Sequence, residues 1–377
     1  MNKLNTHAAC LLAIALCSSS LSRPVLAKPD QLIRNVEVAF VLDTTGSMAS
    51  LIDGAKQKIW SIANEIIDVQ NGEQVKVRFA LIGYRDRQDA YVTKVYDMTD
   101  DIHGIYGHLL AFQAQGGGDR PEAVNQALQE AVNEINWSED QQTLRLIFLV
   151  GDAPPHMDYA NEAQYPAIVG HAAQHNIIVN TVQAGIDRET SRIWREIAHL
   201  GQGDYVAIAQ DGGMQVIHSP YDQDIEALQQ RINRTALGYG TSYERKQLNA
   251  KRDIALNASS AVASDMAEFR LKAGKKNQVI TGASELVEDY EDGTVDLETI
   301  AEADLPDALQ ALSAEERKAK VEALVAERKD LNQKLETLVS RREAHIELER
   351  EKLDASTKED SFDSQVRKTI AKQMKRR

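Results

Sequence analysis

Short continuous apolar runs alternate with helically spaced apolar residues from residue 36 to about residue 209. The run from Val36 to Leu42 predicts a strand buried on both faces, and it ends at Asp43. After it, apolar residues recur at three- and four-residue intervals between Met48 and Ile66, which predicts a helix. Asp43, Thr45 and Ser47 are therefore expected on a strand-to-helix loop.

The same alternation continues along the chain. Strands are predicted at 75–84, 90–96, 144–150, 177–184 and 205–209, and helices at 102–112, 123–135, 160–175 and 191–200. Regular alternation of strand and helix predicts an α/β fold: a doubly wound, mostly parallel sheet with helices on both faces. In such sheets ligands bind beyond the carboxyl ends of the strands, where the loop with Asp43 would lie.

Beyond Gly238 the pattern becomes almost purely helical. Ser313 and Glu316 have the spacing of a capping box that opens a long helix. An apolar stripe with a period near 3.5 follows. Its members are Val321, Leu324, Leu331, Leu335, Leu338 and Ile346. Arg328 and Arg342 interrupt this stripe, so we expect a helix packed in a small helical domain, or a weak dimer through a short coiled coil. Residues 287–296 are acidic and 367–377 are basic, and both are predicted to be solvated surface.

The N-terminus has the pattern of a secretory signal. Lys3 precedes an apolar core from Ala8 to Cys17, and small residues near Ala27 suit a signal peptidase. We therefore expect residues 1–27 to be a cleaved signal, residues 28–237 to form the α/β domain, and residues 238–377 to form the helical region. The apolar core is short for a bilayer span, so an uncleaved anchor is the weaker alternative. The mature protein would then be secreted or periplasmic, without a membrane span.

Composition limits the kinds of site that the chain can form. Its only cysteines, Cys10 and Cys17, fall inside the signal segment, so the mature chain would have no disulfide, thiolate nucleophile or cysteine-type zinc site. A formal net charge of −14 on 377 residues argues against binding of nucleic acid, which needs a basic surface.

Three loops carry oxygen ligands to what should be one sheet edge. The first contains Asp43, Thr45 and Ser47, the second contains Asp119, and the third contains Asp152. Carboxylate and hydroxyl oxygens suit Mg²⁺, with Mn²⁺ or Ca²⁺ as alternatives, rather than zinc or copper.

These motifs resemble the metal-ion-dependent adhesion site (MIDAS) of von Willebrand factor type A (VWA) domains. The D-x-T-x-S run at 43–47, GGGDRPEA at 116–123 and GDAPPH at 151–156 occur in the expected order, and the resemblance covers about residues 34–235. It implies a Rossmann-like fold and a divalent cation held by Asp43, Thr45, Ser47 and a residue of the second loop, with Asp152 acting directly or through water. The family commonly has Thr in the second loop, where this chain has Asp119.

Each of these residues also has a purely structural explanation. Ser47 could be a helix cap, Asp119 and Glu122 have the spacing of a capping box, and Asp152 could end a strand at a turn. Three independent caps would have no reason to bring oxygen ligands to one edge, which favours the metal site.

Other polar positions give weaker signals. His171 and His175 lack the glutamate of a zinc-hydrolase motif and are expected to be a surface pair. His156 could line the site. The step from Tyr84 to Asp86 is expected to be a surface ion pair.

The leading hypothesis is a secreted binding module, not an enzyme, whose cation engages an acidic residue of a partner protein. One alternative is a metal-dependent hydrolase or phosphatase of the haloacid-dehalogenase type, but Thr45 replaces the second carboxylate of its D-x-D motif. The other is a structural envelope protein. Self-association through the C-terminal helices would be compatible with the leading hypothesis.

Overall fold

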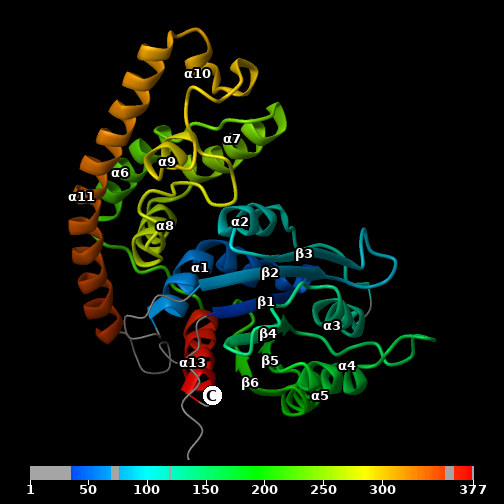
Figure 1. Ribbon diagram of the computed structural model, residues 1–377. Coiled ribbons are helices and arrows are strands. Elements are labelled where there is room, and N and C mark those ends of the chain that lie inside the picture. Colours follow the sequence, from blue (N-terminus) through cyan, green and yellow to red (C-terminus); the bar gives the residue numbers. More distant parts are fainter. Residues whose placement is uncertain (1–34, 69–75, 119, 353–360, 376–377) are drawn as a thin grey trace, which may run out of the picture. The chain divides into compact units, whose positions relative to one another are not determined.

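The computed structural model describes residues 35–68, 76–118, 120–352 and 361–375 (Figure 1). The predicted signal, residues 1–27, and Asp119 lie outside the described residues. All of these described residues belong to one compact unit. In the described part of the chain, no helix combines the length and the apolar composition of a membrane span.

A six-stranded sheet forms the centre of the fold, in the order β3-β2-β1-β4-β5-β6. All neighbouring strands are parallel except β2 and β3, which pair antiparallel at one edge. The strands are β1 (Asn35–Asp43), β2 (Lys76–Tyr84), β3 (Thr93–Thr99), β4 (Thr143–Gly151), β5 (Ile177–Ala184) and β6 (Gln202–Ile208). The predicted doubly wound α/β fold is confirmed, and the predicted edge strand begins three residues later than expected.

Two hydrophobic clusters fill the two faces of this sheet. Alternate residues of β1 point to opposite sides, so that Val38 and Phe40 enter one cluster and Ala39 and Val41 the other. The first cluster contains α1 (Ala49–Asp68), which follows the short helix η1 (Gly46–Met48), and α2 (Ile102–Ala111). The second contains α3 (Val124–Asn133), α4 (Tyr165–Gln174) and α5 (Arg188–Leu200).

The remaining helices follow β6 along the chain (Figure 1), and contacts with α1 and α2 attach part of this group to the core. They are α6 (Asp222–Arg234), α7 (Ser242–Leu256), α8 (Ser260–Lys272), α9 (Leu286–Glu291), η2 (Glu302–Asp304), α10 (Asp307–Gln310), α11 (Ala314–Lys352) and α13 (Phe362–Lys375). The predicted capping box at the start of α11 is present, since Ser313 N–H donates to Glu316 and Glu316 N–H donates to Ser313 Oγ.

The apolar stripe of α11 packs within the same chain, against α6, α8 and α9. Val321, Leu331 and Leu335 are fully buried there. The two arginines that interrupt the stripe are also buried, in ion pairs. Arg328 binds Glu285 at 2.8 Å. These contacts within one chain give no support to self-association through the apolar stripe of α11. Coiled-coil pairing stays a prediction from the sequence.

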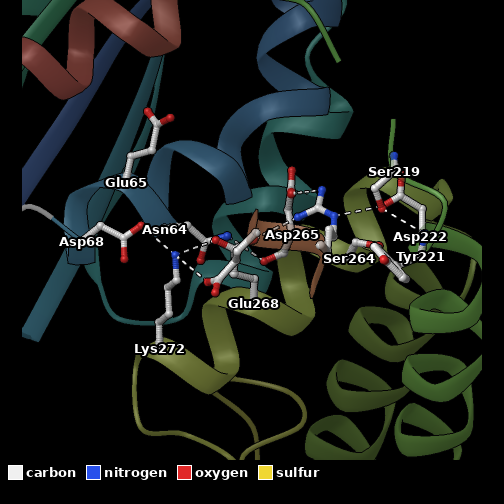
Figure 2. A network of polar contacts seen from close by, with 12 residues as sticks. Asn64, Glu65, Asp68, Ser219, Tyr221, Asp222, Ser264, Asp265, Glu268 and Lys272 are labelled. Carbon is white, nitrogen blue, oxygen red and sulfur yellow. Dashed lines mark hydrogen bonds and ion pairs between the residues drawn. The ribbon is translucent and has the colours of Figure 1, made fainter. Parts of the chain in front are cut away.

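Arg342 joins α11 to α6 and α8 through three carboxylates. Its nitrogens lie 2.9 Å from Asp222, 2.6 Å from Asp265 and 2.9 Å from Glu268. Figure 2 shows these acidic partners with Ser219, which donates its backbone N–H to Asp222 at 2.8 Å. A charge buried without partners destabilises the fold, and here the Arg342 guanidinium and the three carboxylates compensate one another.

The last helix returns to the sheet, which the sequence did not predict. The ring of Phe362 in α13 lies tilted against that of Phe40 in β1, with ring centroids 6.3 Å apart, and the Phe362 N–H donates to Gly212 O at 2.9 Å. Ile370 and Gln373 are fully buried, so the prediction of a solvated tail is wrong for one side of 367–375, whereas Lys368, Lys372 and Lys375 are exposed as predicted.

The prediction that residues 287–296 form a solvated connector is also wrong at its start. Leu286 and Val287 are fully buried in α9, where they pack beneath α11. Beyond the helix the prediction holds better: Asp292 and Asp296 are exposed, whereas Glu288, Asp289 and Glu291 within α9 are partly buried.

Candidate metal centre

The carboxyl ends of β1 and β4 bring two of the predicted loops together. Leu42 pairs with Val150 in the parallel register, so Asp43 and Asp152 emerge side by side at one edge of the sheet. Backbone hydrogen bonds attach the second loop: Gly46 N–H donates to Gly116 O at 3.2 Å, and Glu122 N–H donates to Pro154 O at 2.9 Å. The predicted convergence of the three loops is present in the geometry.

A cleft of about 300 Å³ opens between these loops. It is lined by Thr45, Gly46, Ser47, Gly116, Gly117, Arg120, Glu122, Asp152 and Ala153. Asp43 lies behind Thr45 and is completely buried. Four of the five predicted ligands therefore gather at this cleft, and the fifth, Asp119, falls outside the described residues.

Asp43 is held by its own loop through one oxygen only. Its Oδ1 accepts hydrogen bonds from the Thr45 backbone N–H at 2.8 Å and the Thr45 hydroxyl at 2.6 Å. Its Oδ2 is buried and has no hydrogen-bond partner among the described residues. Burial raises the pKa of Asp43 to about 7, against the opposing effect of the Thr45 hydrogen bonds.

Glu122 is a site residue that the sequence analysis treated only as a capping partner. Its side chain lines the cleft and is 3% exposed, and its Oε2 has no partner among the described residues. Burial, followed by the negative charges of Asp43, Asp86 and Asp89, raises its pKa to about 9. It does not cap α3, which begins at Val124 after an N-cap with no side-chain hydrogen bond.

This donor set fits a divalent cation. Buried carboxylates close to one another and with unsatisfied oxygens are costly unless positive charge compensates them. Two hydroxyls, Thr45 Oγ1 and Ser47 Oγ, lie 3.3 Å apart beside them. Among the described residues no three His, Cys, Asp or Glu side chains are arranged as a metal cluster, so hydroxyl oxygens would have to complete any coordination.

Close backbone packing fixes the position of Asp43. A Cβ on Gly151 would lie 2.4 Å from the Tyr84 hydroxyl and 3.0 Å from the Asp43 Cβ, so this strand end has room only for glycine. Burial, with the neighbouring charges of Asp43, Glu122 and Asp152, raises the pKa of Tyr84 well above its usual value. The Tyr84 side chain is therefore an uncharged neighbour of the Asp43 carboxylate.

Gln210, in the loop after β6, is a second residue that the sequence analysis did not single out. Its side-chain N–H group donates to Asp152 Oδ2 at 2.7 Å and to the Ser47 carbonyl oxygen at 3.3 Å. It joins the first loop to the third and orients the Asp152 carboxylate. No periodicity or motif in the sequence marks this position.

The weaker polar signals have structural roles. Arg85 and Asp86 are both 4% exposed, so the prediction of a surface ion pair is wrong: Arg85 donates to the Gln113 carbonyl at 2.6 Å and Asp86 accepts from the Tyr159 hydroxyl at 2.8 Å. His156 is buried against Asp158 at 2.8 Å and does not line the cleft. The exposed pair His171 and His175 agrees with its prediction.

Comparison with known proteins finds sequence similarity to one family over the sheet and its loops. Residues 37–220, just under half of the chain, match the family model described as von Willebrand factor A domain. An ariadne-like RING finger protein of Acanthamoeba polyphaga mimivirus is 29% identical over 121 residues, which cover 32% of this chain and 11% of that protein. The matched part is thus a small fraction of that protein.

Two solved structures illustrate the similarity. The VWA domain of SpRpn10 has a TM-score of 0.36 and 13% identity, and the match covers 48% of this chain and 89% of that chain. Proximal thread matrix protein 1 from the mussel byssus, with a zinc-occupied MIDAS motif, has a TM-score of 0.36 and 15% identity, over 47% of this chain and 42% of that chain. At such TM-scores neither structure bears on the function of this chain.

Proposed function

We propose that this chain is a metal-dependent protein-binding module of the MIDAS type. Asp43, Thr45, Ser47 and Asp152 would hold one divalent cation at the cleft, with Asp119 as the fifth ligand inferred from the sequence. The observation that carries this proposal is the buried Asp43 carboxylate with one oxygen held by Thr45 and the other unpartnered.

The bound cation would supply an open coordination position for an acidic side chain of a partner protein. The chain's own residues do the rest: Thr45 fixes the Asp43 carboxylate, Gln210 orients Asp152, and the cleft admits the partner side chain. Mg²⁺ is the expected ion because the donors are carboxylate and hydroxyl oxygens, with Mn²⁺ and Ca²⁺ as alternatives.

A hydrolase of the haloacid-dehalogenase type is less well supported. Such chemistry needs an acid or base two residues after the first aspartate, and Thr45 occupies that position with its hydroxyl committed to Asp43. We therefore assign no catalytic residue. Export through the signal at residues 1–27, to a secreted or periplasmic location, remains part of the proposal from the sequence.

Chelator-sensitive capture tests the function. The full mature chain is immobilised and incubated with periplasmic extract and culture medium in Mg²⁺ or EDTA, in parallel with the variant Asp43→Asn. The proposal expects a partner that is retained in Mg²⁺, released by EDTA and absent from the variant. A partner retained equally by the variant, or no EDTA-released protein at all, would contradict it.

A further inference from the structure

Arg120 brings positive charge to a cleft that is otherwise acidic. Among the described residues that line the cleft, it is the only arginine or lysine, beside Glu122 and Asp152. Its side chain is 55% exposed, so a ligand in the cleft can reach it. The guanidinium is always charged and offers paired N–H donors that match a carboxylate.

Arg120 is paired with Asp187, the residue that precedes α5. The two oxygens of Asp187 have different tasks. Oδ1 caps the helix by accepting from the Thr190 N–H and hydroxyl, each at 2.8 Å, whereas Oδ2 faces Arg120. The pair therefore spans the second loop and the loop between β5 and α5.

If Arg120 left Asp187 and paired with the carboxylate of a ligand, the loss of the Arg120–Asp187 ion pair would cost little free energy. An exposed ion pair contributes at most about 1 kcal/mol. Partial burial acts to raise the pKa of Asp187, but the Thr190 hydrogen bonds, followed by the charge of Arg120, outweigh it and hold the pKa below its usual value. The Thr190 bonds stay in place when Arg120 leaves, so Asp187 keeps a stabilised charge.

We propose that Arg120 is the specificity-determining residue of the cleft and binds a second carboxylate of the partner, which displaces Asp187. The inference rests on the proposed function, because the first carboxylate would engage the cation. The favoured partner segment is then a peptide with two acidic residues close together, one for the cation and one for Arg120. A partner with a single acidic residue would leave Arg120 on Asp187.

A peptide selection tests this assignment. A random linear peptide library displayed on phage is panned against the full mature chain in Mg²⁺ and eluted with EDTA. We expect the eluted peptides to be enriched in pairs of acidic residues separated by no more than a few positions. The same selection on Arg120→Ala should enrich single acidic residues.

Three variants quantify the effect with one selected peptide. Arg120→Ala should weaken Mg²⁺-dependent binding about tenfold, as expected for the loss of one charge-assisted contact. Asp187→Asn keeps the capping Oδ1 but removes the competing charge, so it should tighten binding. Arg192→Ala is the matched control, because Arg192 is an exposed arginine that pairs with Glu196 on α5 and does not line the cleft.

The outcomes separate the two proposals. If EDTA elutes peptides but Arg120→Ala selects and binds them as the unchanged chain does, the assignment of Arg120 is wrong and the metal-dependent function stands. Equal weakening by Arg192→Ala would also overturn it, because the effect would be one of net charge. If EDTA elutes no enriched peptide, both the function and the inference fail.

Discussion

Thr45 donates both its backbone N–H and its hydroxyl to Oδ1 of Asp43, at 2.8 and 2.6 Å, and leaves Oδ2 of this buried carboxylate without a partner among the described residues. The arrangement orients a charged group that the fold itself does not neutralise. Because unpaired buried charge is destabilising, the site is suited to a compensating cation.

The buried charge of Asp43 should destabilise the metal-free fold. Replacing Asp43 with Asn should therefore stabilise the metal-free protein and abolish its response to Mg²⁺. Asp43→Asn removes a buried charge while its Oδ1 can still accept from Thr45. We expect the metal-free variant to be more stable than the unchanged chain at pH 8, by about 2 kcal/mol, and to show no stabilisation by Mg²⁺. Urea unfolding with and without Mg²⁺ measures both effects. A variant less stable without metal would mean that Asp43 is a structural cap.

Two adjacent glycines of the second loop, Gly117 and Gly118, should differ in how strongly their replacement by alanine weakens Mg²⁺ binding. Gly117 has φ +83°, and a Cβ there would lie 3.2 Å from the Thr45 Cβ and 3.3 Å from Glu122 Oε1, whereas a Cβ on Gly118 meets nothing within 4 Å. Gly117→Ala should therefore displace the site and weaken Mg²⁺ binding about tenfold, from strain of about 1–3 kcal/mol. Gly118→Ala is the control and should bind as before. Calorimetric titration distinguishes the two, and equal affinities would show that the loop does not shape the site.

The buried ion pairs of α11 predict that this helix is essential to the stability of the unit. Arg342→Met would leave Asp222, Asp265 and Glu268 without their shared cation, and should cost about 3–5 kcal/mol of unfolding free energy. The neighbouring Arg341 is exposed, so Arg341→Met should change stability by less than about 0.5 kcal/mol. Similar midpoints in urea for both variants would show that the network contributes little.

The buried His103 side chain should lower the free energy of unfolding in acid. Burial, with the positive charges of Lys251, Arg270 and Lys275, lowers its pKa from 6.5 to about 3, against the opposing charge of Asp101. The unfolded chain takes up a proton below pH 6.5 and the folded chain does not until about pH 3. Stability therefore falls as pH drops through this window, by about 2 kcal/mol between pH 7.5 and pH 5.

The variant His103→Gln should lose that component of the pH dependence, as measured by urea unfolding across the same pH range. The exposed His199 provides the control, since His199→Gln should retain the full acid sensitivity. If His103→Gln keeps the same slope as the unchanged chain, another group is responsible.

The sheet and the first loop of the site could be predicted because local pattern determines them. The apolar run of β1 ends in Asp43, and its limits follow from the side chains that must be buried on both faces. The parallel arrangement then brings Asp152 to the same edge without further information. Regular alternation is therefore enough to place two of the three loops.

The role of Glu122 could not be read in the same way. Its position three residues after Asp119 has the spacing of a capping box, and only the backbone bonds to Pro154 and His156 turn it into the cleft. Those bonds join segments about thirty residues apart, so they leave no local periodicity. Gln210 contacts Asp152 from still further along the chain.

The C-terminal helices were harder to predict for a related reason. Charge counts suggested solvated surface for the segment around Val287 and for the last helix, yet a few apolar residues, such as Ile370, are fully buried. Arg328 and Arg342 interrupt the apolar stripe in the sequence, but Arg328 pairs with Glu285, the residue before α9, and Arg342 pairs with Asp222 of α6. The periodicity of apolar residues carries no information about such pairing between residues far apart in the sequence.

One divalent cation is proposed to bind at the loop of Asp43, Thr45 and Ser47. Calorimetric titration of Mg²⁺ into the chelator-stripped full mature chain tests this site beside two variants. Thr45→Val introduces a side chain of nearly equal size without the hydroxyl, and Asp53→Asn changes an exposed aspartate of α1. We expect one binding site in the unchanged chain and in Asp53→Asn, and at least about tenfold weaker binding in Thr45→Val. No binding to the unchanged chain, or equal binding by all three proteins, would contradict it.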